Sequence, residues 1–324
     1  MKILFVGLDY YGYAAEICAA FRRLGHEIDF HPIEQGDLPS KVMKKAAASL
    51  YAGRRNRYHR SIAQASEGQA YDMVLFVQVH QVAPDTVRAL RAMHPQARFV
   101  LYNWDSLSTH DYRPWLDLFD YAATFDPEDA RSLGIGYLPL FATPAYFDID
   151  RDRPKDFDLY FVGTVVTAHR FDALQRLQQF CDDRNLTTHL HMYCSPVGRL
   201  RLWRQGRSMP QLTGASVGFG DIIDLIERSR GTFDFANHRQ AGYTMRLIEN
   251  MCAERKIVTD NRRILDEPFY REDRFHVIDG YDFSGIPEFL HTPITSSLDT
   301  RAFSIDQWAL HLANGGPAGL DRAS

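Results

Sequence analysis

The sequence predicts an α/β protein built from two doubly wound, Rossmann-like domains that face a cleft, and three observations support this prediction. Short apolar runs alternate with longer amphipathic segments, as they do in a parallel sheet covered by helices on both faces. The chain has 324 residues, about twice the length of a typical domain. The alternation stops between Pro139 and Pro154, in a stretch that holds three prolines, and then starts again.

The first domain is expected over residues 1–145 and the linker over 146–157. The strands of this domain are the apolar runs at residues 3–6, 27–30, 73–77, 99–102, 121–125 and 135–138. Helices are expected at residues 12–24, from about 41, from Pro84, just before 121, and from Pro127, where Asp126 reads as the N-cap.

The second domain is expected over residues 158–299. Its strands are the runs at 159–162, 189–193, 232–235 and 256–259, and its helices lie at about 169–184, 222–228 and 244–254. Three glycines between residues 214 and 220 indicate a loop. The segment 300–324 holds a last helix at 300–313, which could pack against either domain. Because open α/β sheets bind ligands beyond the carboxyl ends of their strands, functional residues are expected in the loops that follow strands.

Composition excludes several classes of protein. The 37 Lys and Arg residues against 41 Asp and Glu residues give a net charge of -4, so the chain as a whole is not a cationic nucleic-acid binder. The four cysteines lie far apart without a CxxC pair, which predicts reduced thiols rather than a zinc cluster or a disulfide framework. No apolar run approaches the roughly 20 residues that cross a bilayer, and the first run is too short for a signal peptide. The sequence therefore predicts a cytoplasmic protein.

The loop after the first strand carries an acid and two aromatic residues. Gly7 and Gly12 flank Asp9, Tyr10 and Tyr11 just before a helix. Glycines let a ligand approach the backbone, and a helix N-terminus favours anions. The glycine spacing misses GxGxxG, which argues against a nicotinamide enzyme. Asp9, Tyr10 and Tyr11 are candidates for acceptor-side contacts, and an ordinary strand-to-helix turn is the alternative.

Polar residues also follow the fourth strand, where Asn103, Trp104 and Asp105 come directly after the apolar run. Asp105 could act as a general base, with Trp104 as a surface for a sugar and Asn103 as a polar tether. His80 and His110, each just beyond a strand, are rival bases. The alternative for Asp105 is a cap of the next turn.

The second domain opens with a strand that ends in Gly163 and Thr164, and Arg170 stands at the start of the next helix. A strand, a glycine and a helix N-terminus flanked by Thr and Arg make a cradle for phosphate. The alternative is a turn with a solvated Arg170.

The most informative stretch begins at residue 234. Thr244 is expected to cap a helix that carries Arg246 and Glu249 together on one face and an apolar stripe on another. The stripe consists of Leu247, Ile248, Met251 and Cys252. Backbone groups of Gly242 and Thr244 could bind a diphosphate, beside the positive charge of Arg246. Glu249 could then accept hydrogen bonds from ribose hydroxyls, whereas an exposed Arg–Glu pair of little energetic weight is the alternative. The remaining donor-binding candidates precede this helix: His238, Gln240 and Tyr243.

Residues 231–280 resemble the nucleotide-sugar-binding half of GT-B glycosyltransferases and are most similar to the CgeB-like group of spore-coat and lipopolysaccharide biosynthesis. The resemblance rests on two motifs, Gly242-x-x-x-Arg246-x-x-Glu249 and Lys-Ile-Val-Thr-Asp-Asn at 256–261. It implies a GT-B architecture in which Glu249 binds the nucleotide ribose. It also implies that Gly242, Thr244 and Arg246 lie near the diphosphate.

One departure from the family bears on stereochemistry. Many retaining GT-B enzymes carry two glutamates separated by seven residues, and the position eight before Glu249 is Ala241 here. The resemblance therefore favours inversion, with Asp105 as the base. Segment 103–105 also resembles, more loosely, the short acidic motif of this group. The DxD spacing at 148–150 lies in the linker, so no metal is expected. No cofactor is expected either, because the nucleotide sugar is a substrate.

Basic residues cluster between positions 41 and 60 of this slightly acidic chain: Lys41, Lys44, Lys45, Arg54, Arg55, Arg57 and Arg60. Such a cluster attracts anionic lipid headgroups or an anionic glycan, and the alternative is a solvated helix face. Aromatic interleaving is confined to Tyr51 and Tyr58, which disfavours single-stranded nucleic acid.

The sequence thus predicts a glycosyltransferase that moves a sugar from a nucleoside-diphosphate donor to a glycan or glycolipid acceptor in surface polysaccharide or lipopolysaccharide biosynthesis. We expect it in the cytoplasm, peripheral to the inner membrane through residues 41–60, without nucleic acid and without metal. The alternative is a non-catalytic nucleotide-sugar-binding protein with a degenerate GT-B fold.

Overall fold

A computed structural model describes residues 1–35, 48–165, 167–235 and 241–316 of the chain. The contacts divide the chain into two compact units. The first unit comprises Met1–Leu140, Arg239–Tyr243 and Ser304–Ser324, and the second comprises Phe141–His238 and Thr244–Phe303. Each unit is built around one six-stranded parallel sheet.

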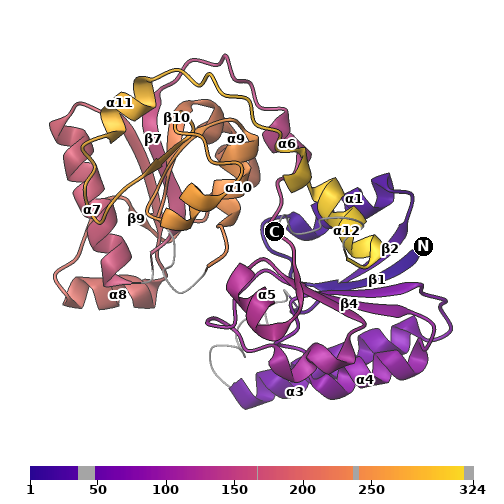
Figure 1. The fold of residues 1–324 in the computed structure, drawn as a ribbon. Coiled ribbons are helices and arrows are strands. Elements are labelled where there is room, and N and C mark those ends of the chain that lie inside the picture. Colours follow the sequence, from indigo (N-terminus) through magenta and orange to yellow (C-terminus); the bar gives the residue numbers. More distant parts are fainter. Residues whose placement is uncertain (36–47, 166, 236–240, 317–324) are drawn as a thin grey trace. The chain divides into compact units, whose positions relative to one another are not determined.

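The first unit has the strand order β2-β1-β3-β4-β5-β6 (Figure 1). Its strands are β1 (Lys2–Gly7), β2 (Glu27–Pro32), β3 (Met73–Val77), β4 (Arg98–Asn103), β5 (Tyr121–Thr124) and β6 (Gly136–Tyr137). Its helices are α1 (Tyr13–Arg23), α3 (Ala48–Ser66), α4 (Pro84–Met93), η1 (Arg113–Leu118), α5 (Pro127–Leu133) and α12 (Ile305–Asn314). Asp126 caps α5 as expected, because its side chain accepts hydrogen bonds from two backbone N–H groups of the first turn.

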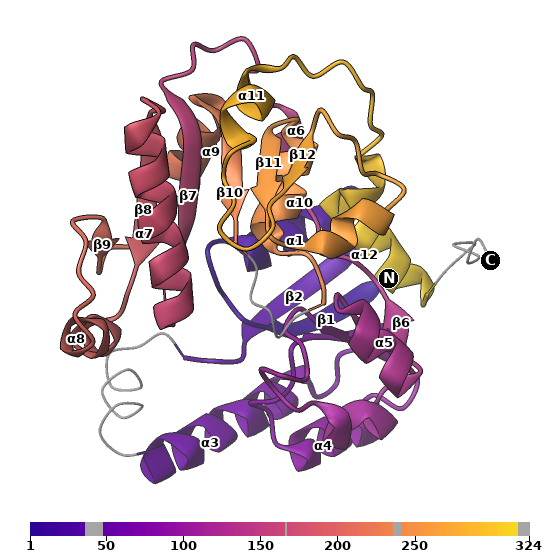
Figure 2. The same ribbon diagram turned by 60° about the vertical axis from the view of Figure 1, so that its left-hand side comes forward.

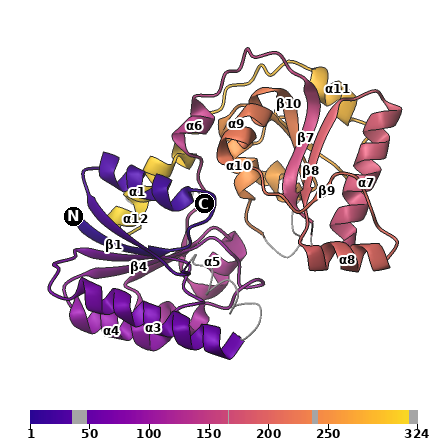
Figure 3. The same ribbon diagram turned by 180° about the vertical axis from the view of Figure 1, so that it is seen from behind.

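Helices cover both faces of this sheet, which is why its inner strands β1, β3 and β4 are buried along almost their whole length. Helices α3 and α4 lie on one face and α1 and α12 on the other (Figures 1 and 3). Trp308 of α12 packs edge-on against Tyr102 of β4, with 5.0 Å between the ring centroids. Asp306 of α12 pairs with Arg23 of α1 at 2.5 Å. The C-terminal helix therefore belongs to the first unit.

The second unit has the strand order β12-β11-β10-β7-β8-β9, and Figure 2 shows β7, β10, β11 and β12 side by side. Its strands are β7 (Phe157–Thr164), β8 (Thr188–Tyr193), β9 (Leu212–Thr213), β10 (Ser229–Asp234), β11 (Lys256–Thr259) and β12 (Phe275–Val277). Its helices are α6 (Pro144–Phe147), α7 (Ala168–Asp183), α8 (Pro196–Arg204), α9 (Phe219–Glu227), α10 (Met245–Cys252), η2 (Arg262–Asp266), α11 (Ile286–His291) and η3 (Arg301–Phe303).

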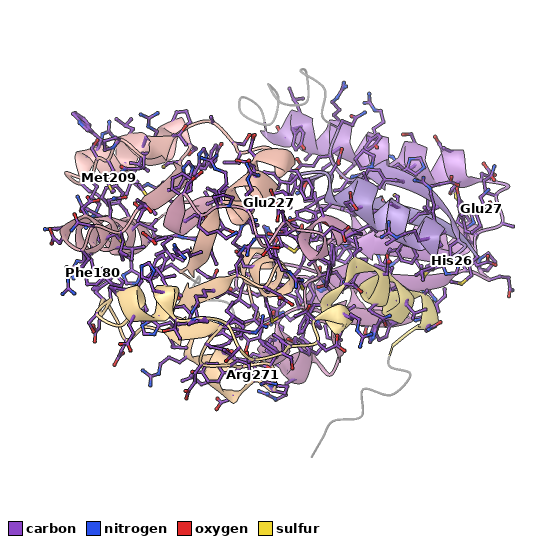
Figure 4. All side chains as sticks on the ribbon, turned by 90° about the horizontal axis from the view of Figure 1, so that it is seen from above. His26, Glu27, Phe180, Met209, Glu227 and Arg271 are labelled. Atoms are coloured by element: carbon purple, nitrogen blue, oxygen red, sulfur yellow. The ribbon has the colours of Figure 1, made fainter. Side chains whose placement is uncertain are left out.

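The core of the second unit lies between its sheet and the two helices α7 and α11. Phe180 and Met209, both labelled in Figure 4, pack against this core while remaining partly exposed. Helices α9 and α10 cover the opposite face (Figure 1). The predicted fold class, two doubly wound α/β domains, is confirmed.

The boundary between the two units falls between Leu140 and Phe141, a few residues before the end of the first domain that the sequence predicted at 145. The backbone N–H of Ala142 donates to the carbonyl of Phe303, which ties this segment to the second unit. The stretch expected as a linker also belongs to the second unit, because Arg153 pairs there with Asp224 at 2.7 Å and Glu227 at 2.6 Å.

Several short elements escape the sequence prediction, because strands of two or three residues and short helices show too little periodicity. These are α6, α8, α11, β9 and β12. The prediction of a loop up to residue 220 is wrong at its C-terminal end, since helix α9 begins at Phe219 and its N-cap is Gly218. In the described part of the chain, no helix is long and apolar enough to cross a membrane.

Candidate functional site

The strand order of each sheet reverses at one point, between β1 and β3 in the first unit and between β7 and β10 in the second. Doubly wound sheets bind ligands at the carboxyl ends of the strands around such a point. Described side chains near these carboxyl ends form two groups, one in each unit.

In the first unit, side chains from two loops form what we call the His–Asp cluster, made of Gln78, His80, Asp105 and His110. Gln78 directly follows β3 and donates a hydrogen bond from Nε2 to Oδ2 of Asp105, which follows β4. Nε2 of His110 lies 3.9 Å from the same carboxylate oxygen. The rings of His80 and His110 stack with 3.6 Å between centroids and 6° between planes. The structure therefore brings the three predicted bases together.

Burial changes the protonation of this cluster. It raises the pKa of Asp105, while the hydrogen bond from Gln78 and the charge of His110 partly oppose that rise. Burial also lowers the pKa of His80 to about 4, with smaller contributions from His110 and from Arg55 on α3. His80 is therefore neutral at neutral pH. The side chain of Asp105 remains 34% exposed, so it is accessible to a substrate.

Gln78 was not predicted from the sequence, although its backbone is unusual. Its φ is 66°, in the left-handed region that residues other than glycine rarely adopt. Its side chain is buried and Oε1 has no hydrogen-bond partner among the described residues. Asn103 is also buried, and its Nδ2 likewise has no hydrogen-bond partner among the described residues. Strained backbone and unpaired buried polar atoms at one strand edge are features of functional sites.

The other acceptor-side candidates are accessible. Asp9, Tyr10 and Tyr11 follow β1 and are all exposed, with Tyr11 66% exposed and at a φ of 51°. Trp104 is half-buried, and its ring lies 6.4 Å from that of Tyr13. Their role in binding an acceptor stays a prediction. Lys41, Lys44 and Lys45 lie outside the described residues.

In the second unit, Arg170, Asp234 and Asp260 form what we call the Arg–Asp cluster. Asp234 ends β10, is 4% exposed, and accepts a hydrogen bond from Oγ1 of Thr244 at 2.7 Å. Arg170 lies in the first turn of α7, where both aspartates interact electrostatically with its guanidinium group. The guanidinium carbon also lies 5.3 Å from the ring centroid of Phe161.

Burial shifts the pKa values of two members of this cluster. Burial lowers the pKa of Arg170 and raises that of Asp234, and the attraction between the two groups opposes both changes. Nε of Arg170 is buried and has no hydrogen-bond partner among the described residues. A guanidinium N–H of this kind suits a phosphate oxygen. The sequence predicted Arg170 but missed Asp234, because the two lie on separate elements.

Gly163 leaves room for this arginine. A Cβ atom on Gly163 would lie 2.8 Å from the Phe161 ring and 3.3 Å from Nη2 of Arg170, so any side chain would displace one of them. Thr164 is exposed at the end of β7. Phosphate binding by Gly163 and Thr164 stays a prediction, because Gly163 is explained by packing alone.

Gly242 and Tyr243 group with the first unit rather than with the helix that follows them. A Cβ atom on Gly242 would lie 2.6 Å from the carbonyl oxygen of Phe125, and the N–H of Ala241 donates to Oδ2 of Asp126 at 2.9 Å. Gly242 thus has a packing role, and Tyr243 is buried. Donor binding by either residue stays a prediction, and His238 and Gln240 lie outside the described residues.

Helix α10 has the predicted cap and apolar stripe. Oγ1 of Thr244 accepts a hydrogen bond from the N–H of Leu247 at 3.1 Å, and all four stripe residues are buried. Nη1 of Arg246 lies 2.6 Å from Oε2 of Glu249. The alternative of an exposed pair is wrong, because the side chain of Glu249 is 0% exposed and that of Arg246 is 19% exposed.

The burial of Glu249 restricts what it can do. Its carboxylate has no accessible surface, so a ribose hydroxyl could reach it only if this part of the structure rearranged. The hydroxyl of Tyr146 on α6 lies near it, since burial and the charge of Glu249 together raise the pKa of Tyr146. The ribose role stays a prediction. As placed, Glu249 positions the guanidinium of Arg246, which reaches the surface.

No group of three or more His, Cys, Asp or Glu residues in the described ranges is arranged to hold a metal ion. No protein-family model matches the sequence, and no curated protein does.

Solved structures match the chain over nearly its whole length. S. aureus MnaA in its UDP co-structure is 11% identical, with a TM-score of 0.58 and 98% of both chains covered. The α,α-trehalose-phosphate synthase (UDP-forming) from Burkholderia vietnamiensis is 10% identical, with a TM-score of 0.57, covering 97% of this chain and 96% of the synthase. AviGT4, a glycosyltransferase involved in avilamycin A biosynthesis, is 13% identical, with a TM-score of 0.55, covering 98% of this chain and 93% of AviGT4. The chain therefore shares the two-domain GT-B fold of these proteins.

Proposed function

We propose that this chain is a glycosyltransferase that moves a sugar from a nucleoside-diphosphate donor to a hydroxyl group of a glycan or glycolipid acceptor. The observation that carries the proposal is the His–Asp cluster. It holds a partly exposed carboxylate whose pKa is raised, at the strand edge where doubly wound sheets bind ligands. Two structural neighbours, named as a glycosyltransferase and as a UDP-forming synthase, support the same chemistry.

In the proposed reaction, Asp105 takes the proton of the acceptor hydroxyl while the oxygen forms a bond to the anomeric carbon of the sugar. The bond between that carbon and the diphosphate oxygen breaks, and the departing nucleoside diphosphate keeps the electron pair. Arg170 supplies positive charge to the diphosphate, and Arg246, positioned by Glu249, supplies more. A single displacement of this kind inverts the anomeric centre and needs no metal.

We assign the activity to the CgeB-like group and to surface polysaccharide or lipopolysaccharide biosynthesis. This assignment is supported by the motif that includes Arg246 and Glu249, and the anionic glycans of that setting match the basic residues between 41 and 60. We further propose that the protein works on the cytoplasmic side of the membrane where such glycans are assembled.

The test begins with a thermal-shift screen of nucleoside diphosphates and their sugars, because a bound ligand raises the unfolding temperature by mass action. Nucleotide release from the best donor is then measured with and without glycan acceptors, for the wild type and for Asp105→Asn. We expect acceptor-dependent release by the wild type, and unchanged nucleotide stabilisation without release in Asp105→Asn. Stabilisation without release by the wild type would favour the non-catalytic alternative, and no stabilisation by any nucleotide would contradict both.

A further inference from the structure

Helix α8 presents apolar side chains to solvent as well as to the core. Val197 is 72% exposed, Leu200 is 46% exposed and Trp203 is 68% exposed. These residues are three positions apart, so they form one stripe along the helix. On the opposite side, Leu202 is 2% exposed and belongs to the core of the second unit. One apolar face therefore anchors α8, and the other is largely open to solvent.

The stripe is flanked by positive charge. Arg199, Arg201 and Arg204 are exposed, and none of them forms an ion pair with a described residue. Arg207, just beyond the helix, pairs with Asp172 at 2.6 Å. Residues 195–212 contain no Asp or Glu, although the whole chain has a net charge of -4. Figure 2 shows α8 at the margin of the second unit, next to β9.

We propose that α8 is a docking surface for an anionic lipid bilayer, with the stripe inserted among the headgroups and the three arginines on lipid phosphates. Helices that lie in a membrane interface combine an apolar face with basic flanks, and tryptophan prefers that depth. Nucleic acid would neutralise the arginines but would leave Val197 and Leu200 without apolar contact. A lipid surface satisfies both features, and this interaction does not depend on the proposed transfer reaction.

Helix α3 is the matched comparison, because it carries the basic tract that the sequence predicted as the membrane contact. Arg57 and Arg60 are exposed on α3. Leu50, 65% exposed, is the one large exposed hydrophobic residue among the described side chains of α3. Helix α3 thus has charge without an apolar stripe, whereas α8 has both.

The experiment measures binding of the full chain to phosphatidylcholine vesicles with and without 30% phosphatidylglycerol (roughly one anionic lipid in three), by flotation. We expect the wild type to bind only the anionic vesicles. Arg201→Gln with Arg204→Gln should weaken this binding about 25-fold, because each arginine near a charged surface contributes about fivefold. Leu200→Ser with Trp203→Ser should abolish it. The matched control, Arg57→Gln with Arg60→Gln on α3, should bind like the wild type.

Tryptophan fluorescence gives a readout of insertion. Trp203 is highly exposed, whereas Trp104 and Trp115 are half-buried and Trp308 is buried. Anionic vesicles should shift the emission of the wild type to shorter wavelength, and Trp203→Phe should bind while losing that shift. The replaced side chains are exposed, so circular dichroism and the unfolding temperature should not change.

Three results would overturn the proposal. The wild type could fail to bind anionic vesicles at low salt, or the α8 variants could bind as the wild type does. The α3 control could lose binding while the α8 variants keep it, which would restore residues 41–60 as the membrane contact.

Discussion

The carboxyl edges of the two sheets have the same architecture but different chemistry. In the first unit, the titratable side chains of the His–Asp cluster keep contact with solvent, with Asp105 34% and His110 38% exposed. In the second unit, Asp234 is 4% exposed and Glu249 is 0% exposed, and both are held beside arginines. A proton acceptor must exchange protons with its surroundings, whereas a fixed cation must be held in place. This difference supports the proposed roles, a base at the first edge and an anion-binding cation at the second.

The largest expected effect tests the first edge. Asp105→Asn keeps the shape of the side chain but removes its ability to take a proton. Turnover should fall by roughly 10²- to 10⁴-fold, the usual range for a positioned base, while nucleotide affinity stays the same. Steady-state kinetics and calorimetric titration measure the two quantities.

His80→Ala and His110→Ala are the controls for this variant, because both rings belong to the same cluster. If Asp105→Asn keeps near-normal turnover and a histidine variant abolishes it, the base is that histidine. The first edge would remain the catalytic one, with a different residue in the role.

The next largest effect concerns the ion pair between Arg246 and Glu249 in the second unit. Glu249→Ala would leave Arg246 without the carboxylate that lies 2.6 Å from it. Breaking a buried ion pair in this way costs about 3–5 kcal/mol, so the denaturant midpoint of the variant should fall markedly. Arg246→Met combined with Glu249→Met should recover much of the loss, since apolar replacement of both partners is often neutral.

The milder variant Glu249→Gln separates this structural role from the ribose role. If Glu249 contacts the ribose, the affinity for the preferred nucleoside diphosphate should fall about 10- to 150-fold in calorimetric titration. An unchanged dissociation constant in a folded Glu249→Gln protein would leave Glu249 as a positioning residue for Arg246 alone.

The third prediction concerns the cation of the second edge. Arg170→Gln should weaken nucleoside-diphosphate binding about 10- to 150-fold, because a hydrogen bond to a charged group contributes about 1.5–3 kcal/mol. Arg176→Gln is the matched control, since Arg176 lies on the same helix and is exposed. Equal affinity of both variants would show that the Arg–Asp cluster is structural, and the contrast between the two edges would then lose its functional meaning.

Features set by neighbouring residues were predictable from the sequence. Thr244 as an N-cap and Asp126 with Pro127 at the start of α5 follow from the local preferences of helix ends, and both are confirmed. The alternation of apolar and amphipathic segments was enough to predict the six strands of the first sheet and four strands of the second, β7, β8, β10 and β11. The Arg246–Glu249 spacing predicted the pair but not its burial, which depends on α6 packing against α10.

Contacts between segments that lie far apart in the chain could not be predicted from the sequence. The meeting of Arg170 with Asp234 depends on the pairing of β7 with β10, which no local pattern encodes. Gln78 takes a left-handed backbone without being glycine, so no turn motif marks it. The stacking of His80 on His110 likewise arises from two loops that only the sheet brings together.

The smallest expected effect concerns Gln78, in the His–Asp cluster of the first unit. This side chain donates a hydrogen bond to the carboxylate of Asp105, which stabilises the charged form and lowers its pKa against the effect of burial. Gln78→Met removes the donor, so the pKa of Asp105 should rise further. A base works only when deprotonated, and the acid limb of the kcat/KM profile should therefore move to higher pH. On that limb kcat/KM should fall about 2- to 10-fold, because one hydrogen bond contributes about 0.5–1.5 kcal/mol, while kcat/KM above the limb should stay the same. If His80 were the base, the limb would follow its pKa of about 4 and would not respond to loss of a donor that bonds to Asp105. A profile that does not move in Gln78→Met would thus separate the two candidates.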